Sequence, residues 1–139
     1  MKTFAHGIGN LKHRKGATEA LALVEMPAPK RVVLPMMQNL GVPAEPIVKV
    51  GDEVAEGQKV ADSSKFVSAP IHASIAGKIV KIEKLTHPTG AQSLSIVIEA
   101  GGEAPVTMRC ELPISPESAA PDDIRKAIRE AGIVGLGGA

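Results

Sequence analysis

The sequence predicts a mainly β fold in which two similar halves of a small sandwich close on each other. The first observation is a strand–turn–strand pattern in residues 48–62, where two apolar segments flank a loop punctuated by Gly51 and Gly57. The second is a repeat, because residues 47–50 (Ile-Val-Lys-Val) return as residues 79–82 (Ile-Val-Lys-Ile). The third is composition, since 11 prolines and 14 glycines favour short strands and turns over long helices.

Residues 48–62 carry the most specific of these signals. Asp52 and Glu53 place polar side chains at the turn, and Gly51 supplies backbone freedom there. The spacing of Gly-Asp, then Val, then Gly-Gln resembles the turn of biotinyl/lipoyl-type β-sandwiches, also called the barrel-sandwich hybrid. The residues expected to cover the core on either side of this turn are Ile47, Val48, Val50, Val54, Val60 and Ala61.

Further strands are expected before and after this unit. Residues 31–36 are rich in β-branched side chains, and residues 78–83 alternate between apolar and charged side chains. Residues 87–90 (His-Pro-Thr-Gly) give a turn signal, and residues 94–98 are the strand that returns from it. A final strand is expected over residues 106–112.

The two ends of the chain differ in character from this β region. Residues 17–26 are compatible with a short helix or with an extended cover strand, and their period does not decide. Pro121, Asp122 and Asp123 suit the first turn of a helix, which is expected to run to Ala131 before a stop at Gly132. Its expected apolar stripe consists of Ile124, Ala127, Ile128 and Ala131.

These patterns divide the chain into three parts. Residues 1–29 are an N-terminal arm or cover segment, and residues 30–112 form the barrel-sandwich hybrid domain. Residues 113–139 comprise a linker, the helix and the start of a glycine loop, which is expected to be truncated because an apolar stretch runs into glycines and stops. A lone Gly-x-Gly-Gly at Gly135, Gly137 and Gly138 is a weak phosphate-binding signal without a following helix.

Composition excludes several function classes. A net charge of +1 and the absence of Trp and Tyr argue against binding to nucleic acid. Cys110 is alone, so neither a disulfide framework nor a cysteine-ligated cluster is expected. The core must be aliphatic, because Phe4 and Phe66 are the only aromatic residues. No stretch approaches the roughly 20 apolar residues of a transmembrane helix, so direct membrane insertion is not expected.

Four isolated side chains are of a type that can form sites. His6 and His13 lack the acidic or sulfur partners of a metal site, and a solvated basic arm is expected. Lys65 lies near the position of the modified lysine in biotinyl/lipoyl carriers, but the Met-Lys-Met or Asp-Lys-Ala surroundings are absent, which favours an ordinary surface lysine. His72 has no nucleophile or paired carboxylate at a diagnostic spacing, so a hydrogen-bonded structural histidine is expected.

Five segments occur in an order that resembles the N-terminal part of the RnfC family. They are residues 30–35 (Lys-Arg-Val-Val-Leu-Pro), 41–46 (Gly-Val-Pro-Ala-Glu-Pro), 48–52 (Val-Lys-Val-Gly-Asp), 66–73 (Phe-Val-Ser-Ala-Pro-Ile-His-Ala) and 132–139 (Gly-Ile-Val-Gly-Leu-Gly-Gly-Ala). RnfC is the NADH-facing subunit of the Rnf ion-translocating electron-transport complex.

The resemblance implies a structural and docking role for this chain rather than catalysis by it. It implies a longer parent that binds FMN, NADH and two 4Fe–4S clusters, with Gly135, Gly137 and Gly138 opening the flavin/NADH-binding loop. The implied partners are the other Rnf subunits, and the implied location is peripheral, on the cytoplasmic side of the bacterial inner membrane.

Two alternatives to this assignment remain open. One is a biotinyl/lipoyl-like carrier or accessory domain of an enzyme. The other is the N-terminal part of a related cobalamin reductase, because residues 6–10 (His-Gly-Ile-Gly-Asn) depart from the Gly-Gly-Ile-His-Pro-like segment usual in RnfC.

Overall fold

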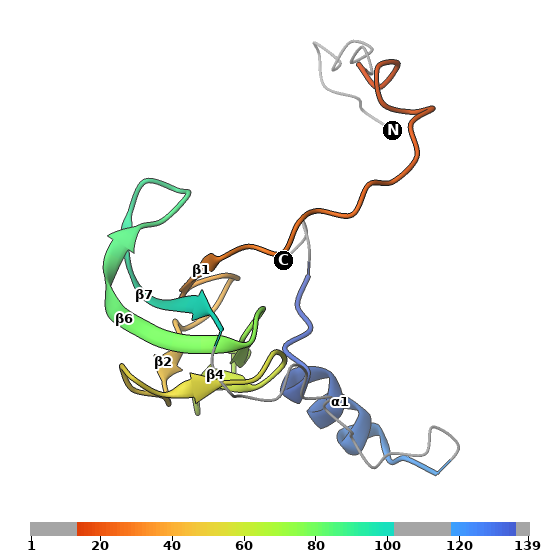
Figure 1. Cartoon of the computed structure of the whole chain (residues 1–139). Coiled ribbons are helices and arrows are strands. Elements are labelled where there is room, and N and C mark those ends of the chain that lie inside the picture. The colour runs from red at the N-terminus through yellow and green to blue at the C-terminus, as the bar shows by residue number, and fades with distance from the viewer. Residues whose placement is uncertain (1–13, 102–117, 136–139) are drawn as a thin grey trace, which may run out of the picture.

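The structure, a computed structural model, describes residues 14–101 and 118–135, in which short strands form two sheets and one helix lies beside them (Figure 1). All strand pairings in both sheets are antiparallel. In chain order the elements are β1 (Arg31–Pro35), β2 (Glu45–Pro46), β3 (Glu53–Val54), β4 (Lys59–Asp62), β5 (Ile71–His72), β6 (Gly77–Thr86), β7 (Gln92–Ala100) and α1 (Pro121–Glu130).

The two sheets share one core. One sheet has the strand order β1-β7-β6-β3 and the other has the order β2-β4-β5. Val54, Ile79, Ile96 and Ile98 of the first sheet pack in one cluster with side chains of the second, and each is 0% exposed. Burying a side chain of this size contributes about 1.5–3 kcal/mol, so the cluster dominates the stability of the domain. This arrangement confirms the predicted mainly β barrel-sandwich hybrid.

The β6–β7 hairpin is the longest feature of the sandwich and follows the prediction closely. Its strands extend beyond the predicted 78–83 and 94–98 on both sides of a turn at His87 to Gly90. The Gly90 amide donates to the His87 carbonyl at 2.8 Å, and the His87 amide donates to the Ala91 carbonyl at 2.7 Å. The turn signal therefore located the reversal correctly.

The internal repeat does not correspond to two equivalent strands. Its second copy lies in β6, but its first copy, residues 47–50, lies outside the strands, and Ile47 and Val50 are each 59% exposed. The Lys49 amide donates to the Asp52 carboxylate at 2.8 Å, and the Asp52 amide donates back to the Lys49 carbonyl at 3.1 Å. These local bonds offer the backbone an alternative to a sheet ladder, so the predicted strand before Gly51 and the predicted burial of Ile47 and Val50 are wrong.

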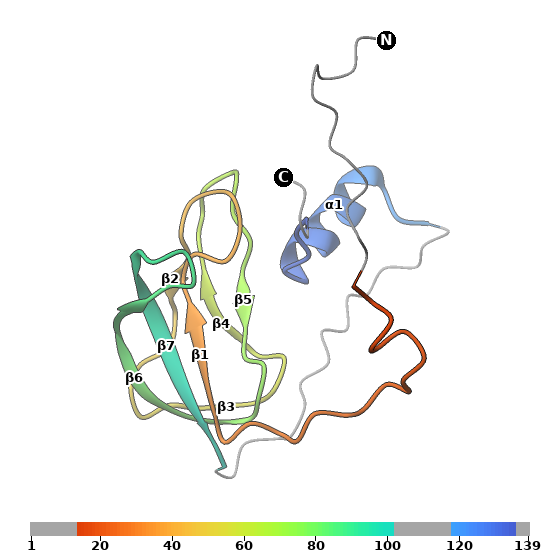
Figure 2. The same cartoon turned by 90° about the horizontal axis from the view of Figure 1, so that it is seen from above.

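Residues 14–28, which precede β1, contact little of the sandwich. Residues 14–28 are exposed, with a turn near Lys15 and extended backbone after it, and both views show the segment leading away from the sheets (Figures 1 and 2). Neither alternative for residues 17–26, a helix or a cover strand, is therefore correct. The predicted strand over 106–112 lies outside the described residues, and the boundaries at 29/30 and 112/113 stay predictions.

Candidate functional site

Helix α1 forms where the sequence predicts it but packs differently. Pro121 occupies the first turn together with Asp122 and Asp123, as the helix dipole favours. None of the ten residues of α1 is buried, and in the predicted apolar stripe Ile124 is 43% and Ile128 46% exposed. In both views α1 lies beside the three-stranded sheet (Figures 1 and 2). Apolar burial therefore does not account for the position of this helix.

Four charged residues join α1 to β4, and we call them the ionic cluster: Lys59, Asp62, Arg129 and Glu130. The Arg129 guanidinium donates to the Asp62 carboxylate at 2.7 Å and to the Glu130 carboxylate at 2.8 Å. Lys59 Nζ contacts Asp62 at 3.1 Å and also forms an ion pair with Glu130. Each carboxylate thus has two cationic partners, one from the helix and one from the strand.

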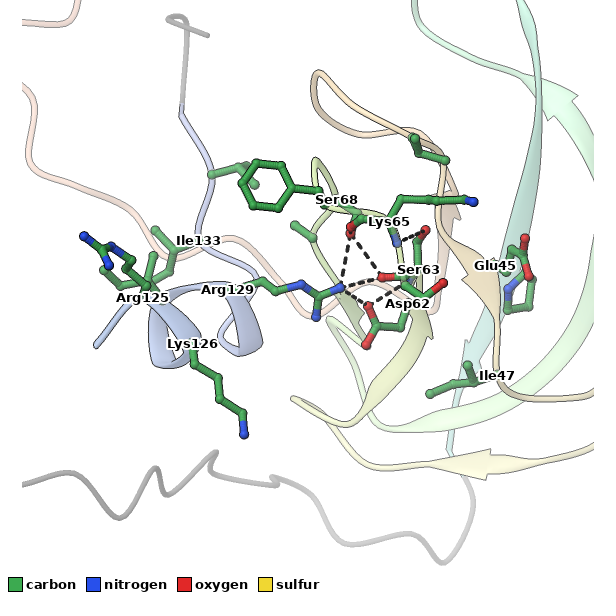
Figure 3. A pocket seen from close by; sticks show the side chains of 17 residues that line it. Glu45, Ile47, Asp62, Ser63, Lys65, Ser68, Arg125, Lys126, Arg129 and Ile133 are labelled. Carbon is green, nitrogen blue, oxygen red and sulfur yellow. Dashed lines mark hydrogen bonds and ion pairs between the residues drawn. The ribbon is translucent and has the colours of Figure 1, made fainter. Parts of the chain in front are cut away.

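Arg129 also reaches the loop that joins β4 to β5, residues 63–70. Its Nη2 donates to the Ser63 carbonyl at 2.6 Å and to Ser68 Oγ at 3.2 Å, and Figure 3 shows the side chain directed from the helix into this set of acceptors. Ser68 Oγ in turn donates to the Lys65 carbonyl at 2.6 Å. One guanidinium therefore fixes the end of α1, the end of β4 and the loop between β4 and β5.

A β-bulge explains how Lys59 and Asp62 reach the same partner. Residues three apart in a regular strand point to opposite faces. The β4–β5 register shifts between Lys59, which pairs with His72, and Ala61, which pairs with Ile71. The bulge brings both charged side chains to α1 while Ala61 stays at 0% exposure in the core.

The contacts within the ionic cluster shift each member toward its charged form. Partial burial raises the pKa of Asp62, but hydrogen bonds from Arg129, the Ser63 amide and Lys59 outweigh it and lower that pKa to about 2. The bond from Lys59 lowers the pKa of Glu130 and correspondingly raises the pKa of Lys59. The bond to Asp62 raises the pKa of Arg129. The cluster is therefore fully ionised at neutral pH.

Gly132 lets the end of α1 approach β5 closely. Its φ of +68° is in the left-handed region, and a Cβ placed on it would lie 2.9 Å from the Pro70 carbonyl oxygen and 3.1 Å from His72 Nδ1. Burial lowers the pKa of His72, and the charge of Lys59 adds to this effect. His72 is half-buried and lies close to Gly132 at the helix end, and its structural role stays a prediction.

A groove of 1060 Å³ opens between α1, the β4–β5 loop and β2 (Figure 3). Phe66 from the loop is 101% exposed, and Ile133 and Val134 from the chain after α1 are 63% and 45% exposed. Lys65 and Lys126 line the groove from opposite sides, on the loop and on the helix. The site thus combines apolar side chains with basic ones, next to the ionic cluster.

Among the predicted site residues, only Gly135 is placed by the structure, next to this groove. Gly135 lines a smaller adjoining hollow together with Phe66 and Val134, whereas Gly137 and Gly138 lie outside the described residues. His6, His13 and Cys110 also lie outside them. Lys65 is exposed in the β4–β5 loop, and its expected role as an ordinary surface lysine stays a prediction.

Sequence reasoning missed the ionic cluster. Arg129 and Glu130 are ordinary residues for the last turn of a helix, and Lys59 and Asp62 are ordinary polar residues for a strand near a turn. One feature of the sequence could have indicated the cluster. The helix face nearest Gly132 has few apolar side chains, which favours packing against polar partners. Nothing in the sequence indicates the bulge that turns both β4 side chains to one side.

Two further classes of site are absent from residues 14–101 and 118–135. Within these ranges no three His, Cys, Asp or Glu side chains gather closely enough to hold a metal ion. The described helix is neither long nor apolar enough to cross a membrane.

The chain resembles three bacterial proteins over 81–99% of its length. It is 39% identical over 137 residues to the C subunit of the Na(+)-translocating ferredoxin:NAD(+) oxidoreductase complex of Acetobacterium woodii, covering 99% of this chain and 31% of that protein. It is 41% identical over 113 residues to the proton-translocating counterpart of Clostridium ljungdahlii, covering 81% and 25%. The C subunit of the ion-translocating oxidoreductase complex of Rhodobacter capsulatus is 37% identical over 130 residues, covering 90% and 24%.

These relatives are longer than the chain, which spans about a third of the first and about a quarter of the other two. Residues 2–103 match the family model described as the RnfC barrel sandwich hybrid domain. That range contains every strand of the two sheets, from Arg31 to Ala100. The chain therefore belongs to the RnfC family, whose barrel-sandwich hybrid domain it contains.

Proposed function

We propose that this chain is the N-terminal structural and docking domain of an RnfC-like subunit in a membrane-bound, ion-translocating electron-transport complex. The observation that carries the proposal is the anchored helix. The ionic cluster and the Gly132 contact hold the end of α1 against the sandwich, immediately before the glycine-rich residues. A rigid sandwich can in this way fix where the rest of a longer subunit begins. The names of the relatives support the assignment to such a complex.

The redox chemistry belongs, in this proposal, to the remainder of the full-length subunit. FMN, NADH and two 4Fe–4S clusters are bound there, and Gly135, Gly137 and Gly138 contribute the opening of the flavin/NADH-binding loop. Glycine suits that position because a side chain would keep the backbone away from a phosphate or ring. In this proposal the described part of the chain positions the redox domains and does not itself catalyse the reaction.

The proposed setting follows from the same assignment. The subunit lies on the cytoplasmic side of the bacterial inner membrane and is held peripherally by the other subunits of the complex. NADH reaches it through the part of the subunit that follows this chain.

The proposal is tested in the full-length subunit with Gly137→Val. A branched side chain at the loop is expected to strip the flavin and abolish NADH oxidation while the N-terminal sandwich keeps its melting temperature. Gly90→Val, placed in the β6–β7 turn where an added Cβ meets nothing within 4 Å, is the matched control and should keep the flavin. Full flavin content and full NADH oxidation in the Gly137→Val protein would contradict the role given to the loop.

A further inference from the structure

We propose that the groove between α1 and the β4–β5 loop is the docking surface for the rest of the subunit's own polypeptide, which presents apolar side chains flanked by carboxylates to it. The inference rests on the proposed function, because it takes this chain as one part of a longer subunit. It goes further by naming the surface and the chemistry of what covers it.

The apolar side chains of the groove favour binding of an apolar segment. Phe66 is fully exposed at the tip of the β4–β5 loop and is the only aromatic side chain among the described residues. Val42, Ile128, Ile133 and Val134 line the same groove and are each at least 45% exposed. Contiguous exposed apolar surface of this kind marks an interaction site, and an exposed aromatic side chain is a typical anchor of one.

The charged side chains of the groove favour a bound segment that carries carboxylates. The lining contributes four basic side chains, Lys65, Arg125, Lys126 and Arg129, against two acidic ones, Glu45 and Asp62. Asp62 and Arg129 neutralise each other within the ionic cluster. Lys65 and Lys126 form no ion pair with any described residue, so two cations on opposite sides of the groove are available to a partner. Complementary charge at such positions sets register and excludes wrong partners.

The path of the chain identifies the source of the occupant. Ile133 and Val134 line the groove itself, and Gly135 lines the hollow beside it, so the polypeptide that follows starts from this surface. The relative from Acetobacterium woodii is about three times as long as this chain. A domain tethered at that point has a high effective concentration at the groove, which makes docking intramolecular.

The test compares side-chain exposure in this 139-residue chain and in the full-length subunit by hydroxyl-radical footprinting. Phe66 is expected to oxidise at least about fivefold more slowly in the full-length subunit, because anchor residues at an interface centre lose contact with water. Val50, which is 59% exposed on a turn outside the groove, is the internal control and should oxidise equally fast in both proteins.

The charge argument is tested in the same assay with a double variant. Lys65→Glu with Lys126→Glu in the full-length subunit is expected to restore rapid oxidation of Phe66. Lys78→Glu with Lys84→Glu, an equal charge change on exposed positions of β6, is the matched control and should leave Phe66 protected.

Two results would overturn the inference. One is equally fast oxidation of Phe66 in both proteins, and the other is protection that arises only when other subunits are added. Flavin content and NADH oxidation, measured on the same samples, separate this failure from that of the proposed function. If both persist while Phe66 stays reactive, only the docking surface is wrong.

Discussion

The sandwich and helix α1 are held in place by different physical forces. In the sandwich, Ile79, Ile96 and Ile98 are completely buried between two sheets. In α1 no residue is buried, and the helix is positioned by the ionic cluster and the close approach of Gly132 to β5. The sandwich should therefore respond to changes in apolar volume, whereas the helix should respond to pH, salt and single polar substitutions.

The difference also predicts two levels of stability. Apolar burial summed over the core is large and is not screened by dissolved ions. Ion pairs with about 30% of each side chain exposed contribute far less, because water and dissolved ions screen them. We therefore expect α1 to detach under conditions that leave the sandwich folded, as local unfolding at the low-stability end of a protein.

The largest effect is expected from a charge in the core. Ile79→Asp should unfold the sandwich, because burying an unpaired carboxylate costs several kcal/mol, comparable with the whole stability of a small domain. Val50→Asp is the matched control. Val50 belongs to the sequence repeat but is 59% exposed, so the Val50→Asp protein should melt at the same temperature as the unsubstituted protein. Thermal melts followed by circular dichroism decide the matter. A folded Ile79→Asp protein would refute the core described above.

A smaller effect, confined to the helix, is expected from Gly132→Val. The new side chain meets the Pro70 carbonyl and His72 and requires a left-handed backbone, which together cost about 1–3 kcal/mol. Amide exchange should become fast in residues 121–132 and stay slow in β6 and β7. Gly90→Val has the same backbone strain, at φ +86°, without the clash. If it accelerated exchange in α1 equally, the close approach would not be the cause.

Acid should release the helix before it affects the sandwich. The pKa of Asp62 is about 2 in the folded protein against 3.8 for the free group, so its pairing stabilises docking above about pH 4 and is lost as the pH falls toward 2. The lowered pKa of Glu130 acts in the same direction. Amide chemical shifts of α1 should change over this range while those of Ile79 and Ile96 do not. An Asp62→Asn protein should lack most of the transition, and an unchanged transition there would assign it to another group.

The smallest effect is expected from Arg129→Met, which keeps the apolar stem and removes the guanidinium. Docking should weaken by about 1 kcal/mol, because the Lys59–Glu130 pair still joins β4 to α1. Arg125→Met removes a pair with Asp122 whose side chains are 76% and 90% exposed, and should change nothing measurable. Exchange in α1 at low and high salt reports both. If the two substitutions changed exchange in α1 equally, the Arg129 contacts would hold the helix no more strongly than an exposed surface ion pair does.

The sequence predicted secondary structure best where a residue type strongly favours one kind of backbone structure. The alternating residues of β6, the His-Pro-Thr-Gly turn and the proline and acids that open α1 each located an element correctly. Residues 47–50 misled because an apolar run predicts a strand, whereas hydrogen bonds between Lys49 and Asp52 close a turn. Phe66 also departs from the usual rule that large apolar side chains are buried. It is the only aromatic side chain among the described residues, and it lies in solvent rather than in the aliphatic core.

The candidate site was harder to predict because its contacts are distant in sequence. Asp62 and Arg129 are brought together by the path of the chain between the sandwich and α1, and hydrophobic periodicity carries no information about that path. The groove likewise depends on loop and helix side chains that meet only in three dimensions. The Gly-x-Gly-Gly pattern of residues 135–138 is visible in the sequence, and its role as a loop that binds FMN and NADH stays a prediction.

The bulge in β4 has a consequence for how this protein can change over evolutionary time. Four successive residues serve two environments, with Val60 and Ala61 in the core and Lys59 and Asp62 toward the helix. Losing Val60 or Ala61 would leave Lys59 and Asp62 on one face but would remove one of the two side chains that this strand buries in the core. Insertions and deletions in this strand are therefore expected to be eliminated by selection.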